Sequence, residues 1–147
     1  MAVCGIIKKL DQHTDRGVPM AIHESGQMYL ETIYILSKTK SLVRAIDVGE
    51  HLEYSKPSVS RALSILKKDG YVLVDSDGAI KLTKTGLEIA QTMYTRHTVL
   101  SEMLMRLGVD EKKATEDACR IEHVISAASF SAIQQHVKQS LEKKAKE

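Results

Sequence analysis

Two short amphipathic segments joined by a tight turn constrain the fold of this chain more than any other feature. Apolar residues recur at helical spacing over residues 44–52, and a second periodic segment follows at residues 57–68. Ser55 is a suitable N-cap for the second helix, Pro57 fits its first turn, and Gly70 can end it. Two short helices connected in this way predict a helix-turn-helix.

A β-hairpin is predicted directly after this motif. Residues 71–74 are apolar and largely β-branched, residues 75–78 read Asp-Ser-Asp-Gly, and residues 79–82 form a second short strand candidate. Turn residues between two such runs are typical of a hairpin. A hairpin after the second helix is a wing, so residues 26–83 are expected to form a winged helix-turn-helix DNA-binding domain.

The rest of the chain is predicted to be helical. Helical periodicity and capping residues indicate helices at about residues 28–36, 83–107, 110–126 and 129–141. The expected fold class is therefore mainly α with a small β-hairpin. Residues 1–25 lack sustained periodicity and are expected to be an N-terminal leader, and residues 84–147 should form a second, helical domain.

Composition limits the class of protein. The 147 residues carry a formal net charge of +2, and no apolar run approaches the roughly 18 residues that a membrane span needs. The apolar stretch at residues 3–7 precedes two lysines, which is the wrong order for a secretory signal. We therefore expect a soluble, cytoplasmic protein with no membrane partner. Both cysteines, Cys4 and Cys119, are expected to be free thiols.

The strongest chemical signal is the group Cys119, Glu122 and His123. On a helix these positions are three and four residues apart, so the thiol, carboxylate and imidazole would project from one face. Met28 and Glu31 place a thioether and a second carboxylate three residues apart on another predicted helix. Two such helices packed together would enclose a transition-metal ion. The competing interpretation is a small buried cysteine beside an ordinary polar pair.

An ordered series of segments carries a resemblance to a known family. The segments are Met28-Tyr-Leu-Glu-Thr-Ile-Tyr34, Tyr54-Ser-Lys-Pro-Ser-Val-Ser60, Lys68-Asp-Gly-Tyr-Val72, Leu82-Thr-Lys-Thr-Gly86, Arg96-His97 and Asp117-Ala-Cys-Arg-Ile-Glu-His123. Over about residues 27–137 the chain resembles the diphtheria toxin repressor family, the iron- and manganese-responsive bacterial transcription regulators. The resemblance implies a metal-binding and dimerisation role for residues 84–147. It also implies that the SH3-like domain of the iron-responsive branch is absent, because the chain ends at Glu147.

Metal ligands follow from the resemblance position by position. The residues that match the primary site of the iron-responsive branch are Met28, Cys119, Glu122 and His123. Glu31 and His97 match ligand positions of the manganese-responsive branch, which would have Asp in place of Met28 and Glu in place of Cys119. The chain thus combines features of both branches.

The donors favour iron as the cofactor. Thioether and thiolate sulfur are softer than carboxylate oxygen, which favours Fe(II), Co(II), Ni(II) or Zn(II) over Mn(II) at the Met28 and Cys119 end of the site. The expected cofactor is a divalent transition metal, Fe(II) first and Mn(II) next. The resemblance leaves one or two metal ions per chain open, because Ser101 and Thr115 replace the acid and the histidine of the iron branch's second site, whereas Glu102, one residue away, is a candidate substitute for the acid.

The N-terminal turn of the predicted recognition helix is the expected DNA-reading surface. The segment from residue 55 to residue 70 contains Lys56, Arg61, Lys67 and Lys68 but only one acid, Asp69. The residues expected to contact double-stranded DNA are Ser55, Lys56, Pro57, Ser58, Ser60 and Arg61. Arg61 suits guanine or phosphate, Pro57 suits a thymine methyl group, and the others suit backbone oxygens.

These features predict a metal-dependent transcriptional repressor rather than an enzyme, with no small-molecule substrate. The predicted partner is a palindromic operator that controls metal-ion homeostasis genes. A homodimer is expected, because symmetry-related reading helices address half-sites about 34 Å apart, one turn of DNA. This part of the chain has more apolar residues than one core needs. The expected dimer interface therefore consists of Val99, Leu100, Met103, Leu104 and Leu107.

Two alternatives remain open at this level. A winged-helix regulator could act without metal and respond to a small molecule or to oxidation of Cys119. A metallohydrolase could use the same ligand types, but it needs an open coordination position and a nearby general acid or base. No motif for that chemistry is evident, and a basic recognition helix with a wing would have no role in it.

Overall fold

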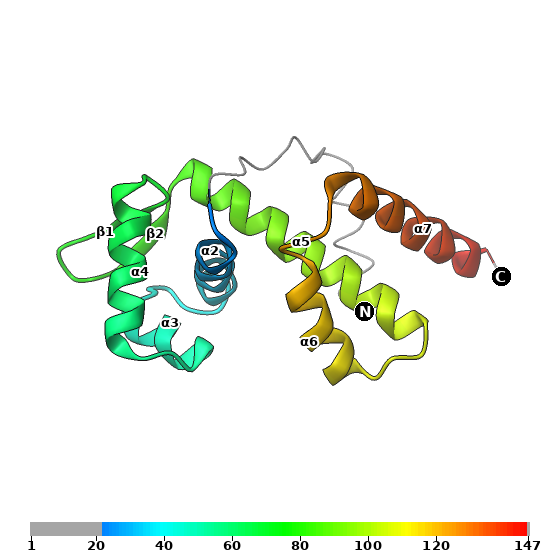
Figure 1. Ribbon diagram of the computed structural model, residues 1–147, viewed down its shortest axis with the longest axis horizontal. Coiled ribbons are helices and arrows are strands. Elements are labelled where there is room, and N and C mark those ends of the chain that lie inside the picture. The colour runs from blue at the N-terminus through cyan, green and yellow to red at the C-terminus, as the bar shows by residue number, and fades with distance from the viewer. Residues whose placement is uncertain (1–21, 147) are drawn as a thin grey trace. The chain divides into compact units, whose positions relative to one another are not determined.

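The computed structural model describes residues 22–146 of the chain. Figure 1 colours the elements in chain order from blue to red. The elements are α2 (Glu24–Ser37), α3 (Ala45–Leu52), α4 (Lys56–Lys68), β1 (Val72–Val74), β2 (Ile80–Leu82), α5 (Lys84–Arg106), α6 (Glu111–Ile121) and α7 (Ala127–Ala145). The expected fold class, mainly α with a small β-hairpin, is confirmed.

The described chain divides into two compact units, and the division falls within α5, between Met93 and Tyr94. The winged-helix unit contains α2, α3, α4, the hairpin and the first part of α5. The helical unit contains the remainder of α5, with α6 and α7. Each unit has its own set of buried apolar side chains.

The predicted helix-turn-helix consists of α3 and α4. Glu53 ends α3 in the left-handed backbone region, with φ of 56°. The backbone N–H of Tyr54 donates to the Gly49 carbonyl at 3.0 Å. Ser55 then caps α4, because its Oγ accepts the backbone N–H of Ser58 at 3.4 Å. The cap satisfies a helix-end donor that would otherwise lack an intrahelical partner.

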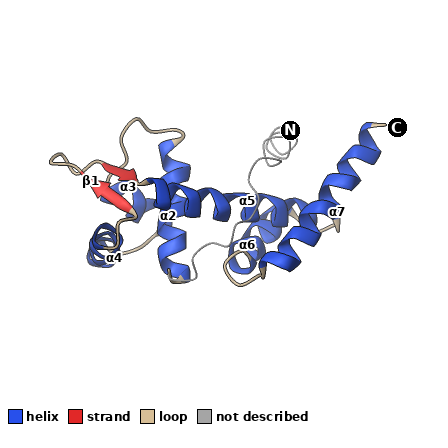
Figure 2. Cartoon of the chain, turned by 90° about the horizontal axis from the view of Figure 1, so that it is seen from above, coloured by secondary structure: helices blue, strands red, loops and turns tan. Residues whose placement is uncertain are grey.

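The predicted wing is also confirmed. Strands β1 and β2 pair antiparallel with Val72 opposite Leu82, and Figure 2 draws them in red next to α4. Asp75 organises the turn between them, because its Oδ1 accepts the backbone N–H groups of Asp77 and Ala79, each at 2.9 Å. The side chain thereby closes a loop whose backbone is exposed.

A glycine allows α5 to begin close against the hairpin. Thr83 caps the helix, because its Oγ1 accepts the backbone N–H of Gly86 at 3.2 Å. A Cβ atom at Gly86 would collide with the Tyr71 carbonyl. Only glycine permits this close approach of two backbones. The core of the winged-helix unit includes Leu30, Ile33, Val48, Val59, Val72 and Ile89.

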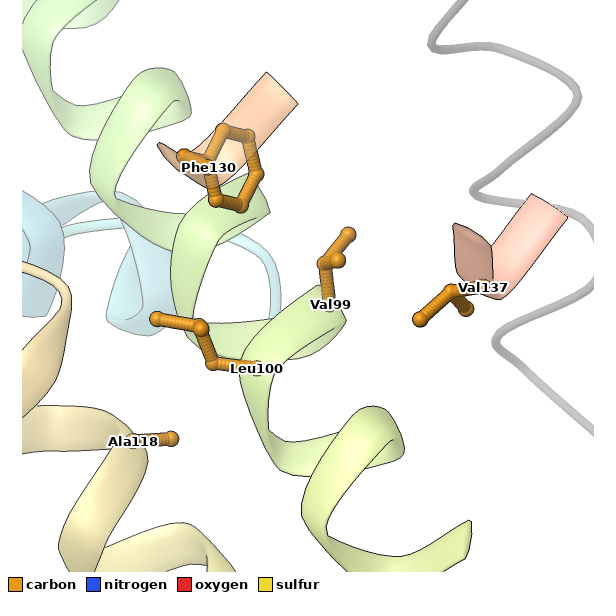
Figure 3. Packing of buried hydrophobic residues seen from close by; sticks show 5 residues of the cluster. All are labelled: Val99, Leu100, Ala118, Phe130 and Val137. Atoms are coloured by element: carbon orange, nitrogen blue, oxygen red, sulfur yellow. The ribbon is translucent and has the colours of Figure 1, made fainter. Parts of the chain in front are cut away.

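The helical unit has a core formed by three helices. Figure 3 shows Val99 and Leu100 from α5, Ala118 from α6, and Phe130 and Val137 from α7. Val99 and Leu100 are both fully buried within this cluster. Their prediction as dimer-interface residues is therefore wrong, because they pack against helices of their own chain. Leu107, from the same predicted set, is 74% exposed.

The end of α6 differs from the prediction. The helix was expected to reach about residue 126, but it ends at Ile121, and residues 122–126 form a turn. Ser126 instead caps α7, with its Oγ accepting the backbone N–H of Ser129 at 3.1 Å. A cap needs an extended backbone, which is incompatible with a helix that continues through Ser126. At the other end, α2 begins at Glu24, earlier than predicted, while the leader residues 1–21 and Cys4 lie outside the described residues.

Candidate metal centre and nucleic-acid interface

A buried carboxylate between two imidazoles forms the centre of the helical unit's candidate metal site. Oε2 of Glu122 lies 2.8 Å from Nδ1 of His97, and Oε1 lies 3.2 Å from Nε2 of His123. Glu122 has no exposed surface, and its neighbours are mostly buried as well. His97 projects from α5, whereas Glu122 and His123 follow directly after α6.

This arrangement has the chemistry of a metal site. Burying a carboxylate carries a large desolvation cost unless hydrogen bonds or opposite charge offset it. Two imidazoles next to one carboxylate offer nitrogen and oxygen donors, a set that suits divalent transition metals. The residues present therefore fit a transition-metal ion, with Glu122 as the central ligand.

Arg96 fixes the turn that carries these ligands. Its Nη1 donates to the carbonyl oxygens of Glu122 at 3.2 Å and Ile125 at 3.1 Å. The guanidinium also lies 5.5 Å from the centroid of the Phe130 ring, a cation–π contact, and Arg96 is only 8% exposed. The positive charge of Arg96 at the C-terminal end of α6 also interacts favourably with the negative end of the helix dipole.

Arg96 was not predicted as a functional residue. It appeared in the sequence only as the neighbour of His97, without a role of its own. A buried arginine is rare unless it is paired, but burial at this position depends on contacts with residues more than 25 positions away. Local sequence patterns therefore contained no signal for its function.

Cys119 lies on α6, one helical turn before Glu122, and its thiol is partly buried. The expectation that Cys119, Glu122 and His123 project from one face of one helix stays a prediction: α6 ends at Ile121, but Glu122 keeps a helical backbone, and its N–H donates to the Ala118 carbonyl at 2.9 Å. The residues brought together are His97, Glu122 and His123. The two histidines reach the same carboxylate from α5 and from the turn after α6.

The other two predicted ligands belong to the winged-helix unit. Met28 and Glu31 both lie on α2, where their spacing places them on the same side of the helix. Glu31 is 6% exposed, an unusual degree of burial for an acid. The hydroxyl of Tyr54 donates toward Sδ of Met28 over 4.0 Å. A second buried carboxylate and a thioether are therefore held together on α2.

The predicted DNA-reading residues form an accessible surface at the start of α4. The exposed members are Ser55, Lys56, Pro57, Ser60 and Arg61, and Ser58 is partly buried beside the cap. The first turn of α4 has no acidic residue, and Lys67 and Lys68 lie in the last turn. Backbone N–H groups at a helix start, with basic side chains beside them, suit phosphate oxygens.

Two protein-family profiles match the chain, one over the winged-helix part and one over the helices that follow. The profile of the iron dependent repressor N-terminal DNA-binding domain matches residues 21–80. The profile of the iron dependent repressor metal-binding and dimerisation domain matches residues 83–143.

No helix within the described residues is both long and apolar enough to cross a bilayer.

Curated relatives fall in the same group. The diphtheria toxin repressor of Corynebacterium diphtheriae is 35% identical over 104 residues, which cover 70% of this chain and 46% of that protein. The HTH-type transcriptional regulator MntR of Bacillus subtilis is 34% identical over 109 residues, covering 74% of this chain and 77% of that protein. The chain therefore spans less than half of the first relative but most of the second.

Solved structures show the same fold. The manganese regulator SloR has a TM-score of 0.70 at 26% identity, with 77% of this chain and 53% of that chain covered. A manganese-dependent transcriptional repressor in complex with manganese has a TM-score of 0.71 at 26% identity, with coverage of 77% and 52%. Similarity thus extends over the winged helix and the helices that follow it.

Proposed function

The chain belongs to the iron-dependent repressor family, and on that premise we propose that it is a divalent-metal-dependent transcriptional repressor that binds operator DNA as a homodimer. The family consists of DNA-binding repressors and not of enzymes. The proposed targets are genes of metal-ion homeostasis.

One observation supports this proposal more than any other: the carboxylate of Glu122 is fully buried and lies within 3.2 Å of two imidazoles. An acid in that position is costly for stability unless it serves a ligand or an ion pair. The match of the surrounding residues to a metal-binding and dimerisation domain favours the ligand role.

We assign six residues to the metal: Met28, Glu31, His97, Cys119, Glu122 and His123. Bound there, a divalent cation would neutralise the charge of the buried carboxylates. Glu122 supplies oxygen, the histidines supply neutral nitrogen, and Met28 and Cys119 supply sulfur. Cys119 must lose its proton to bind, so affinity should rise with pH.

The sulfur donors favour Fe(II) as the physiological metal, with Mn(II) second. Thioether and thiolate are softer than carboxylate, and softer ligands discriminate against manganese. Glu31 and the two histidines suit either metal. Replacing Met28 by Asp together with Cys119 by Glu should therefore move the preference toward Mn(II).

DNA recognition is assigned to the exposed start of α4. Arg61 suits a guanine edge or a phosphate, and Pro57 suits a thymine methyl group. Ser55, Lys56, Ser58 and Ser60 suit backbone oxygens, which set the register of the helix on the duplex. One such helix reads few bases, so a symmetric dimer on a palindromic operator supplies the remaining specificity.

Metal occupancy would act by changing the population of a DNA-binding conformation of the protein. A ligand can shift such an equilibrium only through its different affinity for the two states. Coupling of about 1–3 kcal/mol corresponds to a change of roughly 5–150-fold in DNA affinity.

The test is a DNA-binding titration under anaerobic conditions, which protect Cys119. Operator fragments are first selected from a random duplex library with the metal-loaded protein. Fluorescence anisotropy then measures affinity with EDTA and with Fe(II), Mn(II), Co(II) or Zn(II). We expect tight binding only with metal, and loss of that gain in Glu122→Gln. Equal affinity with EDTA and with every metal would refute the proposal.

A further inference from the structure

The proposed metal ligand Met28 contacts the turn of the helix-turn-helix. The hydroxyl of Tyr54 donates toward Sδ of Met28 at 4.0 Å, a long contact that suits the large and weakly accepting sulfur atom. The Tyr54 ring also packs against that of Tyr29, with centroids 6.0 Å apart and planes inclined by 58°. Tyr29 adjoins Met28 on α2 and is buried.

Tyr54 occupies a critical position in the chain. It directly precedes Ser55, the residue whose hydroxyl caps α4 and which belongs to the proposed DNA-reading surface. A shift of the Tyr54 backbone therefore moves the cap and the first turn of α4. No flexible linker separates the contact with Met28 from the start of the reading helix.

The residue before Tyr54 has a strained backbone. Glu53 adopts φ of 56°, a left-handed conformation that non-glycine residues rarely take. Such a conformation persists only where surrounding contacts hold it. The contacts of Tyr54 with Tyr29, Met28 and the Gly49 carbonyl are of this kind. The backbone N–H and the side chain of Tyr54 are therefore both among the contacts that hold the turn.

We propose that Tyr54 is a positioning residue that transmits metal ligation at Met28 to the N-terminal turn of the DNA-reading helix. The inference rests on the proposed function and deepens it by naming a route inside the winged-helix unit. A methionine side chain has three rotatable bonds and adapts readily to its surroundings. Ligation fixes Sδ, and a fixed Sδ holds the Tyr54 hydroxyl and the turn in one position.

The test removes only the hydroxyl. Tyr54→Phe keeps the ring and its packing with Tyr29, so the turn retains its apolar contacts. Tyr34→Phe is the matched control, because it removes a tyrosine hydroxyl from α2 while preserving the ring that Lys38 contacts at 4.5 Å. For each protein we measure metal affinity, DNA affinity with EDTA, and DNA affinity with saturating Mn(II).

The expected result is a smaller metal-induced gain in DNA affinity. In Tyr54→Phe the ratio of affinities with and without metal should fall about two- to fivefold, the range for loss of one weak hydrogen bond. Metal-free DNA affinity and the thermal midpoint of the metal-free protein should remain those of the wild type. Tyr34→Phe should retain the wild-type ratio. A wild-type ratio in Tyr54→Phe would overturn the proposal.

A double-mutant cycle separates transmission from general loosening of the turn. In the Met28→Leu background there is no sulfur for the hydroxyl to contact, so Tyr54→Phe should have no further effect on the ratio. An equal loss in both backgrounds would contradict transmission through Met28. If the wild type itself shows no metal-dependent gain, the proposed function fails first, and that outcome is distinct from a failure at Tyr54.

Discussion

Nδ1 of His97 lies 2.8 Å from Oε2 of Glu122, although 25 residues separate the two along the chain. Helix α5 provides the histidine, and the turn after α6 provides the carboxylate. Glu122 has no exposed surface, and its backbone N–H still donates to the Ala118 carbonyl at 2.9 Å. The packing of α5 and α6 in one core thus brings the two donors together.

Replacing the central carboxylate should separate metal binding from folding. Glu122→Gln keeps the size of the side chain and a hydrogen-bonding oxygen but removes the negative charge. Metal affinity should fall by more than about 100-fold, because this is a direct ligand and even outer-shell changes cost roughly 10–100-fold. Competition with a chromophoric chelator measures the affinity.

The control for that experiment is Glu116→Gln. Glu116 lies on the exposed side of α6, 3.6 Å from Lys113. Without metal, Glu116→Gln should unfold at nearly the wild-type temperature and Glu122→Gln should remain folded, and only Glu122→Gln should bind metal weakly. Wild-type metal affinity in Glu122→Gln would remove Glu122 from the ligand set.

Loss of the Arg96 guanidinium should destabilise the helical unit. Arg96→Met keeps much of the apolar stem but leaves the carbonyls of Glu122 and Ile125 without their buried donor. We expect a decrease of about 2–4 kcal/mol in the free energy of unfolding, as for two lost buried hydrogen bonds. Urea denaturation of the metal-free protein measures the change.

Arg106→Met is the matched comparison for Arg96. Arg106 pairs with Glu102 one turn away near the end of α5, at 2.6 Å, and both side chains are partly exposed. Exposed pairs of this spacing contribute only about 0.3–0.5 kcal/mol. Equal effects of the two substitutions would show that the Arg96 contacts do not hold the turn.

Two glycines in the winged-helix unit should respond oppositely to alanine. A Cβ at Gly86 would collide with the Tyr71 carbonyl, whereas at Gly49 the nearest atoms are 3.4 Å away. Gly86→Ala should therefore destabilise the protein by more than about 2 kcal/mol, because backbone must move. Gly49→Ala should stabilise it by up to about 1 kcal/mol through helix propensity. Denaturation midpoints that shift in the same direction would contradict this geometry.

Protonation of Asp47 at acidic pH should lower the stability of the winged-helix unit. The hydrogen bond from Lys40, at 2.8 Å, and that from the backbone N–H of Arg44 hold the pKa of Asp47 below its ordinary value of 3.8. The unfolded chain therefore takes up this proton first, so the contribution to stability is present above pH 3.8 and is lost as pH falls through the lower native pKa.

The variant Asp47→Asn tests this pH dependence. The difference in thermal midpoint between wild type and variant should be constant near neutral pH and should shrink as the pH decreases below 3.8. Both side chains of the Lys40 pair are partly exposed, so the effect should be small. A difference that grows toward acid would contradict the direction of the pKa shift.

The parts of the fold that local signals specify could be predicted from the sequence. The cap at Ser55, the turn at Asp75 and the periodicity of α4 are determined by neighbouring residues, so the helix-turn-helix and wing were anticipated. The end of α6 was not, because Arg96 of α5 binds the carbonyls that follow the helix.

The candidate metal site likewise combines features specified by neighbouring residues with features set by distant ones. The ligand types were recognisable from Glu122 and His123, since their spacing is local. Their arrangement around one carboxylate depends on α5, and the burial of Val99 and Leu100 depends on α6 and α7. Long-range packing of this kind leaves little trace in periodicity, so residues expected at a dimer interface lie in the core instead.

The most direct measurement is anomalous diffraction from crystals of the protein grown with Mn(II) or Fe(II) under anaerobic conditions. Our account predicts an anomalous peak about 2.0–2.5 Å from a carboxylate oxygen of Glu122, with a histidine donor atom in the same coordination sphere. A fully occupied peak remote from Glu122 would contradict it.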